Sequence, residues 1–185
     1  MDEGLRSELL RRAHEDQQAR QAIERFFSHD GRVIGQSPEE RAAIEHLGRV
    51  DADNIAWLKN LIDQQGWPSR RTVGEEGADA AWLLAQHADQ DPAFQRLCLQ
   101  LMRQATGGDV DATQVAYLTD RVQLAHGLPQ IYGTQVEHVD GEWRPRHLAD
   151  PDTVDDRRAG VGLGPIADYL HGFQTGAYRS REEDP

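Results

Sequence analysis

The chain has 185 residues, of which 38% are hydrophobic and 28% charged, and its formal net charge is −12. This composition is typical of a soluble globular protein. The negative charge repels phosphate backbones and anionic lipid, so we expect neither nucleic acid nor a membrane as a partner. No segment is apolar over a membrane-spanning length, and the N-terminus lacks a signal-peptide core, which together favour a cytoplasmic location in a bacterial cell.

Cys98 is the only cysteine, which excludes an intrachain disulfide and a thiolate metal cluster within one chain. It stands between Leu97 and Leu99. An apolar setting of this kind indicates a buried, unreactive thiol.

Apolar residues at helical spacing predict a long amphipathic helix over residues 5–27. After a loop, Ser37, Pro38 and Glu40 form a strong helix start, with Ser as the N-cap, Pro at the first position and Glu three residues after the cap. We expect this helix to end near Gly48.

Asp53 is expected to cap the next helix, which ends at Gly66. After a loop that extends to Gly74, residues 75–88 are apolar on nearly every side, which predicts a buried central helix. Further start and stop signals predict two more helices, over residues 92–105 and 112–126.

The periodicity changes after residue 127. Residues 131–139 and 142–146 are typical of a short β-hairpin with an Asp140-Gly141 turn, and Pro145 limits the second strand to a sheet edge. Two short helices are expected after Asp150 and Pro165.

The predicted fold is therefore mainly α, a helical-hairpin bundle with a small β-hairpin near residues 130–146. We expect one domain over residues 1–173, in which the helix at 5–27 packs on a core at 37–173. Residues 174–185 are expected to form a disordered tail.

The first candidate site is Gln86-His87-Ala88-Asp89, at the end of the central helix. His87 can act as a general acid or base if Asp89 orients its imidazole. The alternative is a histidine that caps the helix C-terminus. A metal site needs about three converging ligands, and His87 and Asp89 supply only two.

The second candidate is Asp120-Arg121, on the predicted helix 112–126. Adjacent helical residues point about 100° apart, so Asp120 and Arg121 each need a partner elsewhere. The alternative is a solvated helix surface.

The third candidate is Tyr132-Gly133-Thr134-Gln135, followed by Glu137. On an extended chain Gly133, Gln135 and Glu137 share one side, which would present an amide and a carboxylate to a ligand. The alternative is a polar edge hairpin.

The fourth candidate is the segment Asp155 to Arg158, with three glycines after it. These glycines lack the preceding strand and the spacing of a nucleotide-binding loop. Arg158 can clamp a substrate carboxylate; a structural salt bridge to Asp150 or Asp155 is the alternative.

Several of these motifs occur together, and the chain resembles a bacterial family of unknown function. The motifs that carry the resemblance are Gly66-Trp67-Pro68, Gln86-His87-Ala88-Asp89, Tyr117-Leu118-Thr119-Asp120-Arg121-Val122, Tyr132-Gly133-Thr134-Gln135, Asp155 to Arg158 and Val161-Gly162-Leu163. The resemblance covers roughly residues 50–170. It implies that these motifs form one module and assigns no activity.

The leading hypothesis is an enzyme without an organic cofactor that performs hydrolysis or a related elimination on a small polar or peptide-derived substrate. His87, Asp120 and Asp89 would be the catalytic residues, with no metal. The expected substrate-binding residues are Arg121, Tyr132, Gln135, Glu137, Arg158 and Gln86.

Two alternatives remain open. In a non-catalytic module that binds a peptide or protein, the same residues would form a structural network. In a metal-dependent enzyme, His87, Asp89 and Asp120 would hold the metal.

Overall fold

The computed structural model describes residues 1–24, 26, 37–105 and 108–177. It confirms a mainly α fold, because these residues form seven α-helices, one short 3-10 helix and a two-stranded antiparallel sheet. The chain divides into two compact units, Met1–Val110 and Asp111–Pro185, where the sequence predicts one domain over residues 1–173. Among the described residues, no helix combines the length and apolar character needed to cross a membrane.

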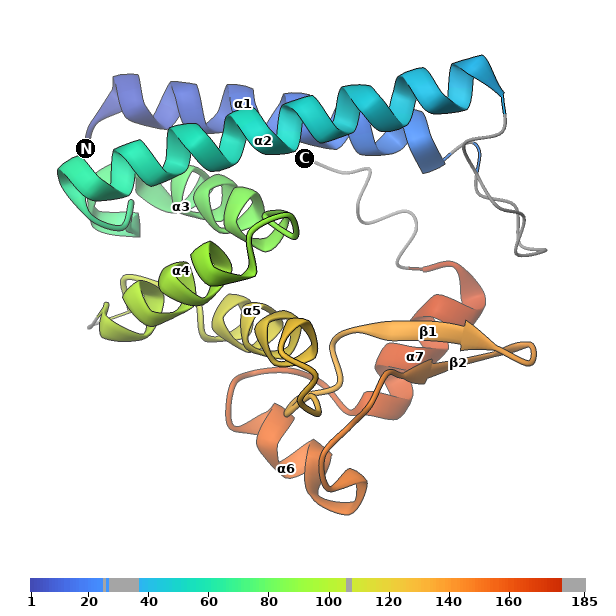
Figure 1. Ribbon diagram of the computed structural model, residues 1–185. Helices are drawn as coiled ribbons and strands as arrows, with labels where there is room; N and C mark the ends of the chain where they lie inside the picture. Colours follow the sequence, from blue (N-terminus) through green and yellow to red (C-terminus); the bar gives the residue numbers. More distant parts are fainter. Residues whose placement is uncertain (25, 27–36, 106–107, 178–185) are drawn as a thin grey trace. The chain divides into compact units, whose positions relative to one another are not determined.

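The first unit consists of helices that pack around one apolar core. These are α1 (Glu3–Glu24), α2 (Pro38–Gln65), α3 (Arg70–Gln86) and α4 (Pro92–Gln104). Helices α1 and α2 lie side by side, α3 packs on both of them, and α4 packs on α3 (Figure 1). Core side chains from all four helices include Leu9, Leu58, Val73, Ala81, Leu84, Cys98 and Met102. Burial raises the pKa of the Cys98 thiol to about 12, which confirms the predicted buried thiol.

Helix α2 begins as the sequence predicts but continues through the predicted break. Ser37 Oγ accepts from the Glu40 amide at 3.1 Å, and the Glu40 carboxylate accepts from the Ser37 amide at 3.0 Å, which forms a capping box. The predicted end at Gly48 is wrong, because a helical glycine costs only about 1 kcal/mol, which tertiary packing outweighs. The predicted N-cap at Asp53 is also wrong: that carboxylate pairs with Arg12 of α1, at 2.6 Å.

Helix α3 starts earlier than predicted and contains a kink. It begins at Arg70 rather than at residue 75, and Gly74 interrupts it with non-helical backbone angles, φ 75° and ψ 176°. The predicted start at residue 75 thus corresponds to the longer segment after the kink, since the single preceding turn gives little periodic signal.

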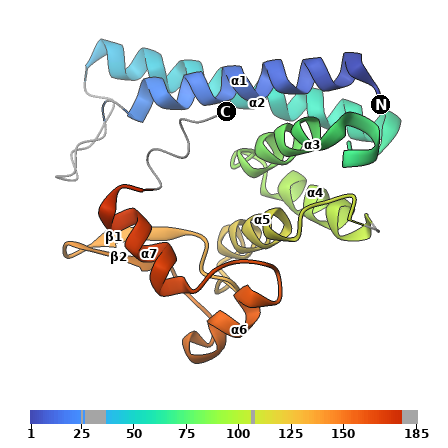
Figure 2. The same ribbon diagram turned by 180° about the vertical axis from the view of Figure 1, so that it is seen from behind.

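The second unit contains the hairpin and the remaining helices. Its elements are α5 (Ala112–Ala125), β1 (Val136–Val139), β2 (Glu142–Pro145), the 3-10 helix η1 (Pro151–Thr153), α6 (Val154–Ala159) and α7 (Ile166–Thr175). The predicted tight turn is present, with positive φ at Asp140 and Gly141. Helix α7 packs on β2 (Figure 2). The rings of Phe173 and Trp143 are in contact there. Of the expected tail, residues 178–185 lie outside the described residues.

The strand predicted at residues 131–139 is shorter than expected. Strand β1 begins at Val136, and the segment from Tyr132 to Gln135 is not extended strand. Gly133 has φ +68°, a left-handed conformation that breaks the alternation of side chains across a strand. The expected shared side of Gly133, Gln135 and Glu137 is therefore wrong as a strand face.

Candidate functional site

In the first unit His87 belongs to a cluster of charged side chains. His87 is the C-cap residue of α3, and its Nδ1 lies 2.6 Å from Oδ2 of Asp16 on α1. Arg20, one turn after Asp16, donates to the Asp16 carboxylate and, through Nη2, to Asp51 Oδ1 on α2 at 2.7 Å. The Asp16 side chain is only 1% exposed, against 16% for His87 and 23% for Arg20. The cluster therefore has a buried carboxylate at its base and its imidazole nearer the surface.

Two side chains compete for Nδ1 of His87. Arg20 Nε also lies 2.8 Å from this nitrogen, and a guanidinium can only donate. Nδ1 cannot accept from Arg20 and donate to Asp16 at the same time. Burial opposes ionisation of Asp16, but the hydrogen bond from His87 and the charges of His87 and Arg20 hold its pKa below the usual value. The tautomer in which Nδ1 donates to Asp16 leaves Nε2 as the atom that exchanges protons in a neutral ring.

Asp51 provides a second titrating group in the cluster. Burial raises its pKa to about 6, Arg20 opposes that rise, and the negative charges of Asp16 and Asp89 add to it. Proximity of like charges raises the pKa of a carboxyl because the ionised form is repelled. Asp51 therefore changes its charge close to neutral pH, beside an imidazole–carboxylate pair.

Next to His87, Gln95 of α4 holds the backbone of Gln86 and the side chain of Asp89. Gln95 Nε2 donates to the Gln86 carbonyl and to Asp89 Oδ1, each at 3.0 Å. The side-chain oxygen of Gln86 is buried and has no hydrogen-bond partner among residues 1–24, 26, 37–105 and 108–177. An unsatisfied buried acceptor costs about 1–3 kcal/mol, so this oxygen is an available acceptor for a water or a ligand.

Sequence reasoning missed the three residues that complete the cluster, Asp16, Arg20 and Asp51. A signal for two of them was present. Asp16 and Arg20 are four residues apart and share a helical face with Leu9 and Ile23, so a charged pair lies where a core-facing position is expected. Asp51 carried no such signal, because the predicted break in α2 concealed its position on the buried face.

In the second unit Asp120 forms a different kind of buried site. It is 0% exposed, and its two oxygens accept hydrogen bonds from the backbone amides of Ile131, Tyr132 and Thr134, at 2.7 to 3.2 Å. The Thr134 hydroxyl adds another at 3.0 Å. One carboxylate thereby fixes the whole loop between α5 and the hairpin.

Arg158 also stabilises this loop. Its side chain is 2% exposed, donates to the carbonyl oxygens of Tyr132 and Gly164 at 2.8 and 2.6 Å, and lies over the ring of Tyr169. The Tyr169 hydroxyl donates to the Thr134 carbonyl at 2.8 Å. Arg158 thus donates to backbone carbonyls instead of forming the salt bridge to Asp150 or Asp155 that the sequence left open.

Gln130 completes the support of the loop, although sequence reasoning did not single it out. It is 0% exposed; its amide nitrogen donates to the carbonyls of Gln135 and Arg146, and its oxygen accepts from the Gln135 amide. A buried amide with several backbone partners replaces the pairing that a strand would have made.

The remaining predicted residues are distributed between the two units. Gln86, His87 and Asp89 belong to the first unit; Asp120, Arg121, Tyr132, Gln135, Glu137 and Arg158 belong to the second. Within the second unit, the structure brings Asp120 and Arg158 together on the backbone of Tyr132. Gln135 donates to Thr134 Oγ1 at 3.3 Å, whereas Glu137 lies exposed on β1.

The metal-dependent alternative lacks a ligand set in the described part of the chain. Among those residues, no three His, Cys, Asp or Glu side chains converge in a way that could hold a metal ion.

The fold and the cluster define a mainly α protein in which an imidazole is paired with a buried carboxylate. The chain belongs to DUF6624, a family of unknown function whose model matches residues 3–180, which confirms the resemblance to such a family. No curated protein and no solved structure matches the chain.

Proposed function

We propose that the protein is an enzyme that performs acid–base chemistry at His87. The observation that supports this most directly is the 2.6 Å contact between His87 Nδ1 and the buried Asp16 carboxylate. A buried carboxylate fixes the tautomer and the orientation of an imidazole and stabilises its protonated form during proton transfer. His87 Nε2 is then the atom that takes a proton from a substrate or delivers one.

Asp51 and Arg20 support the same proposal. Arg20 contacts both Asp16 and Asp51, so its position links the two carboxylates electrostatically. Asp51, with a pKa of about 6, is a proton acceptor or donor matched to neutral pH. Groups with perturbed pKa values occur frequently at catalytic sites, because proton transfer is efficient when the pKa lies near the working pH.

The proposed reaction is hydrolysis or elimination on a small polar or peptide-derived molecule, without an organic cofactor, in the bacterial cytoplasm. The net charge of −12 supports a substrate other than nucleic acid. Asp120 and Arg158 have no role in the proposed proton transfer, because their polar atoms hold the backbone of one loop. Asp16 replaces Asp89 and Asp120 as the residue that orients His87.

A second function, a non-catalytic binding module, is favoured by one observation. Arg20 and Asp16 join α1 to both α2 and α3, so the same cluster can serve as a structural connection between helices. Buried ion-pair networks of this kind specify helix packing in some proteins.

The experiment that separates the two functions compares His87→Asn with His46→Asn in the full-length protein. An Asn amide can replace Nδ1–H as a donor to Asp16, but it cannot exchange a proton. Turnover is measured on a panel of small esters, amides and dipeptides, together with the midpoint of thermal unfolding. The enzyme proposal expects His87→Asn to lose at least about 100-fold in turnover with a near-native midpoint. His46 is exposed on α2, so its variant is the matched control.

Equal turnover by His87→Asn and the wild type would overturn the proposed role of His87. Absence of turnover across the panel, together with a large fall in the unfolding midpoint of His87→Asn, would favour the binding module. Because both measurements use the same preparations, a folding defect cannot be mistaken for lost catalysis.

A further inference from the structure

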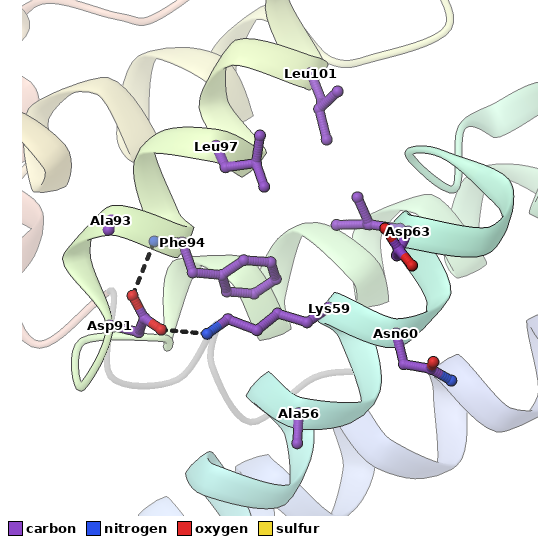
Figure 3. A pocket seen from close by; sticks show the side chains of 10 residues that line it. Ala56, Lys59, Asn60, Asp63, Asp91, Ala93, Phe94, Leu97 and Leu101 are labelled. Atoms are coloured by element: carbon purple, nitrogen blue, oxygen red, sulfur yellow. Dashed lines mark hydrogen bonds and ion pairs between the residues drawn. The ribbon is translucent and has the colours of Figure 1, made fainter.

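A groove lies between α2 and α4 of the first unit, apart from the His87 cluster. It encloses about 980 Å³. Figure 3 shows Phe94 and Leu97 on one wall and Lys59 on the facing helix, all directed toward the space between the helices. Its lining includes Lys59, Asp63, Phe94, Leu97 and Leu101.

The wall contributed by α4 is a second apolar face of that helix. Its core face carries Cys98 and Met102, which are buried, whereas Phe94, Leu97 and Leu101 follow one another at three- and four-residue steps along the groove. Leu97 is 43% exposed, while Phe94 is 3% exposed and forms the floor. Apolar side chains at this spacing on one helix, opposite a second helix, are the arrangement that receives an amphipathic helix.

The two charged side chains that face the groove from α2, Lys59 and Asp63, differ in their pairing. Lys59 is the only lysine of the chain; it pairs with Asp91 Oδ2 at 2.5 Å and lies 5.3 Å from the centroid of the Phe94 ring. The positive charge of the groove is therefore already neutralised. Asp63 is exposed on the α2 side and has no ion-pair partner within the described ranges. The exposed Asp63 carboxylate favours a ligand that brings a cation.

We propose that this groove docks a basic amphipathic helix of a partner protein. The distance from Phe94 to Leu101 is seven residues of helix, about 10 Å, which matches two turns of the docked helix. Apolar residues at i, i+3 or i+4, and i+7 of the partner pack along the α4 wall, where they cover Leu97 and Leu101 beside the buried Phe94 ring. An Arg or Lys of the partner pairs with Asp63. A second copy of this chain is a poorer occupant, because each copy carries a net charge of −12.

The test uses two synthetic 16-residue helical peptides with the same leucine pattern, one with arginine and one with glutamate at the polar positions. Binding to the full-length protein is measured by fluorescence anisotropy. We expect the arginine peptide to bind and the glutamate peptide to bind at least tenfold more weakly. Leu97→Asp should weaken binding of the arginine peptide by at least tenfold. Leu128→Asp is the matched control, since Leu128 is an equally exposed leucine (48%) of the second unit.

Two further measurements locate the peptide. Asp63→Asn should reduce affinity for the arginine peptide several-fold at low salt and have a smaller effect at high salt, because exposed charge pairs are screened. Lys59 is the only lysine, so bound peptide should slow its modification by an amine-reactive reagent, with the N-terminal amine as the internal reference.

The proposal is overturned if the arginine peptide does not bind, if both peptides bind equally, or if Leu97→Asp binds as well as Leu128→Asp. A dimer in sedimentation that Leu97→Asp abolishes would show that a second copy occupies the groove instead. Circular dichroism confirms that each variant is folded; if Leu97→Asp is not, Leu97→Ser replaces it in the same comparison.

Discussion

Asp16 and Asp120 are both almost fully buried carboxylates, but their partners differ in kind. Asp16 contacts an imidazole and a guanidinium, whereas Asp120 contacts backbone amides and one hydroxyl. Backbone amides do not titrate, so the backbone partners of Asp120 keep the same charge at every pH. The Asp16 site can gain or lose a proton at His87 and at Asp51. Burial alone therefore does not identify a reactive carboxylate; the chemistry of its partners does.

The largest effect should come from removing the carboxylate that holds the loop. Asp120→Ala leaves three buried amides and one hydroxyl without their acceptor, and we expect a loss of about 3–5 kcal/mol in the free energy of unfolding. Urea titration measures this loss. The exposed Asp156→Ala is the control; similar stability of the two variants would contradict the structural role of Asp120.

Asp16→Asn should be less destabilising than Asp120→Ala. We expect it to lower the free energy of unfolding by about 2–3 kcal/mol, because Arg20 keeps Asp51 as a partner. Its distinctive effect is on His87. Nitrogen-15 chemical shifts should show a proton on Nδ1 in the wild type and a loss of that preference in Asp16→Asn. An unchanged tautomer in the variant would mean that another group fixes the ring.

Gly133→Ala tests the geometry of the loop. An added Cβ would lie 2.7 Å from Ile166 Cδ1, and the residue would keep φ +68°, so we expect a cost of about 1–3 kcal/mol. Gly127→Ala is the matched control, because Gly127 has φ +72° with open space around it. The difference between the unfolding midpoints of Gly133→Ala and Gly127→Ala measures the clash with Ile166. Ile166→Val should recover part of the stability lost in Gly133→Ala.

The smallest effect is a pH dependence that arises in the Asp16 cluster of the first unit. The pKa of Asp51 is about 6 in the folded state and 3.8 ordinarily, so between those values the folded state retains a proton that the unfolded state has released. The free energy of unfolding should therefore fall as pH rises from about 4 to about 6. Asp51→Asn should remove this slope and stabilise the protein at pH 7 by about 1 kcal/mol.

Asp16 acts in the opposite direction and in a lower range, because its pKa is depressed in the folded state. Its contribution is present above pH 3.8 and is lost as the pH falls below that value. Unfolding curves of Asp51→Asn and Asp16→Asn across this range give the two contributions separately. A slope between pH 4 and 6 that persists in Asp51→Asn would rule out Asp51 as its source.

The sequence by itself determined the local features. Helix starts such as Ser37-Pro38, the Asp140-Gly141 turn and the buried Cys98 all follow from residue chemistry within a few positions, and each is present in the structure. The mainly α class follows from the same periodicity. The sequence also placed Asp120 and Tyr132 at one junction, because a helix end followed by a short connection brings neighbouring segments together.

Only the tertiary structure decided which partner each polar side chain has. His87 contacts Asp16 across 71 residues of sequence. Asp53 pairs with Arg12 of α1 instead of capping a new helix, and Asp51 pairs with Arg20 of the same helix. Hydrogen bonds and ion pairs depend on distance in space, and local periodicity contains no information about which distant helix packs alongside. The loop at Tyr132 shows the same limit: the residues alternate as in a strand, but the buried Asp120 carboxylate accepts hydrogen bonds from their amides in place of a second strand.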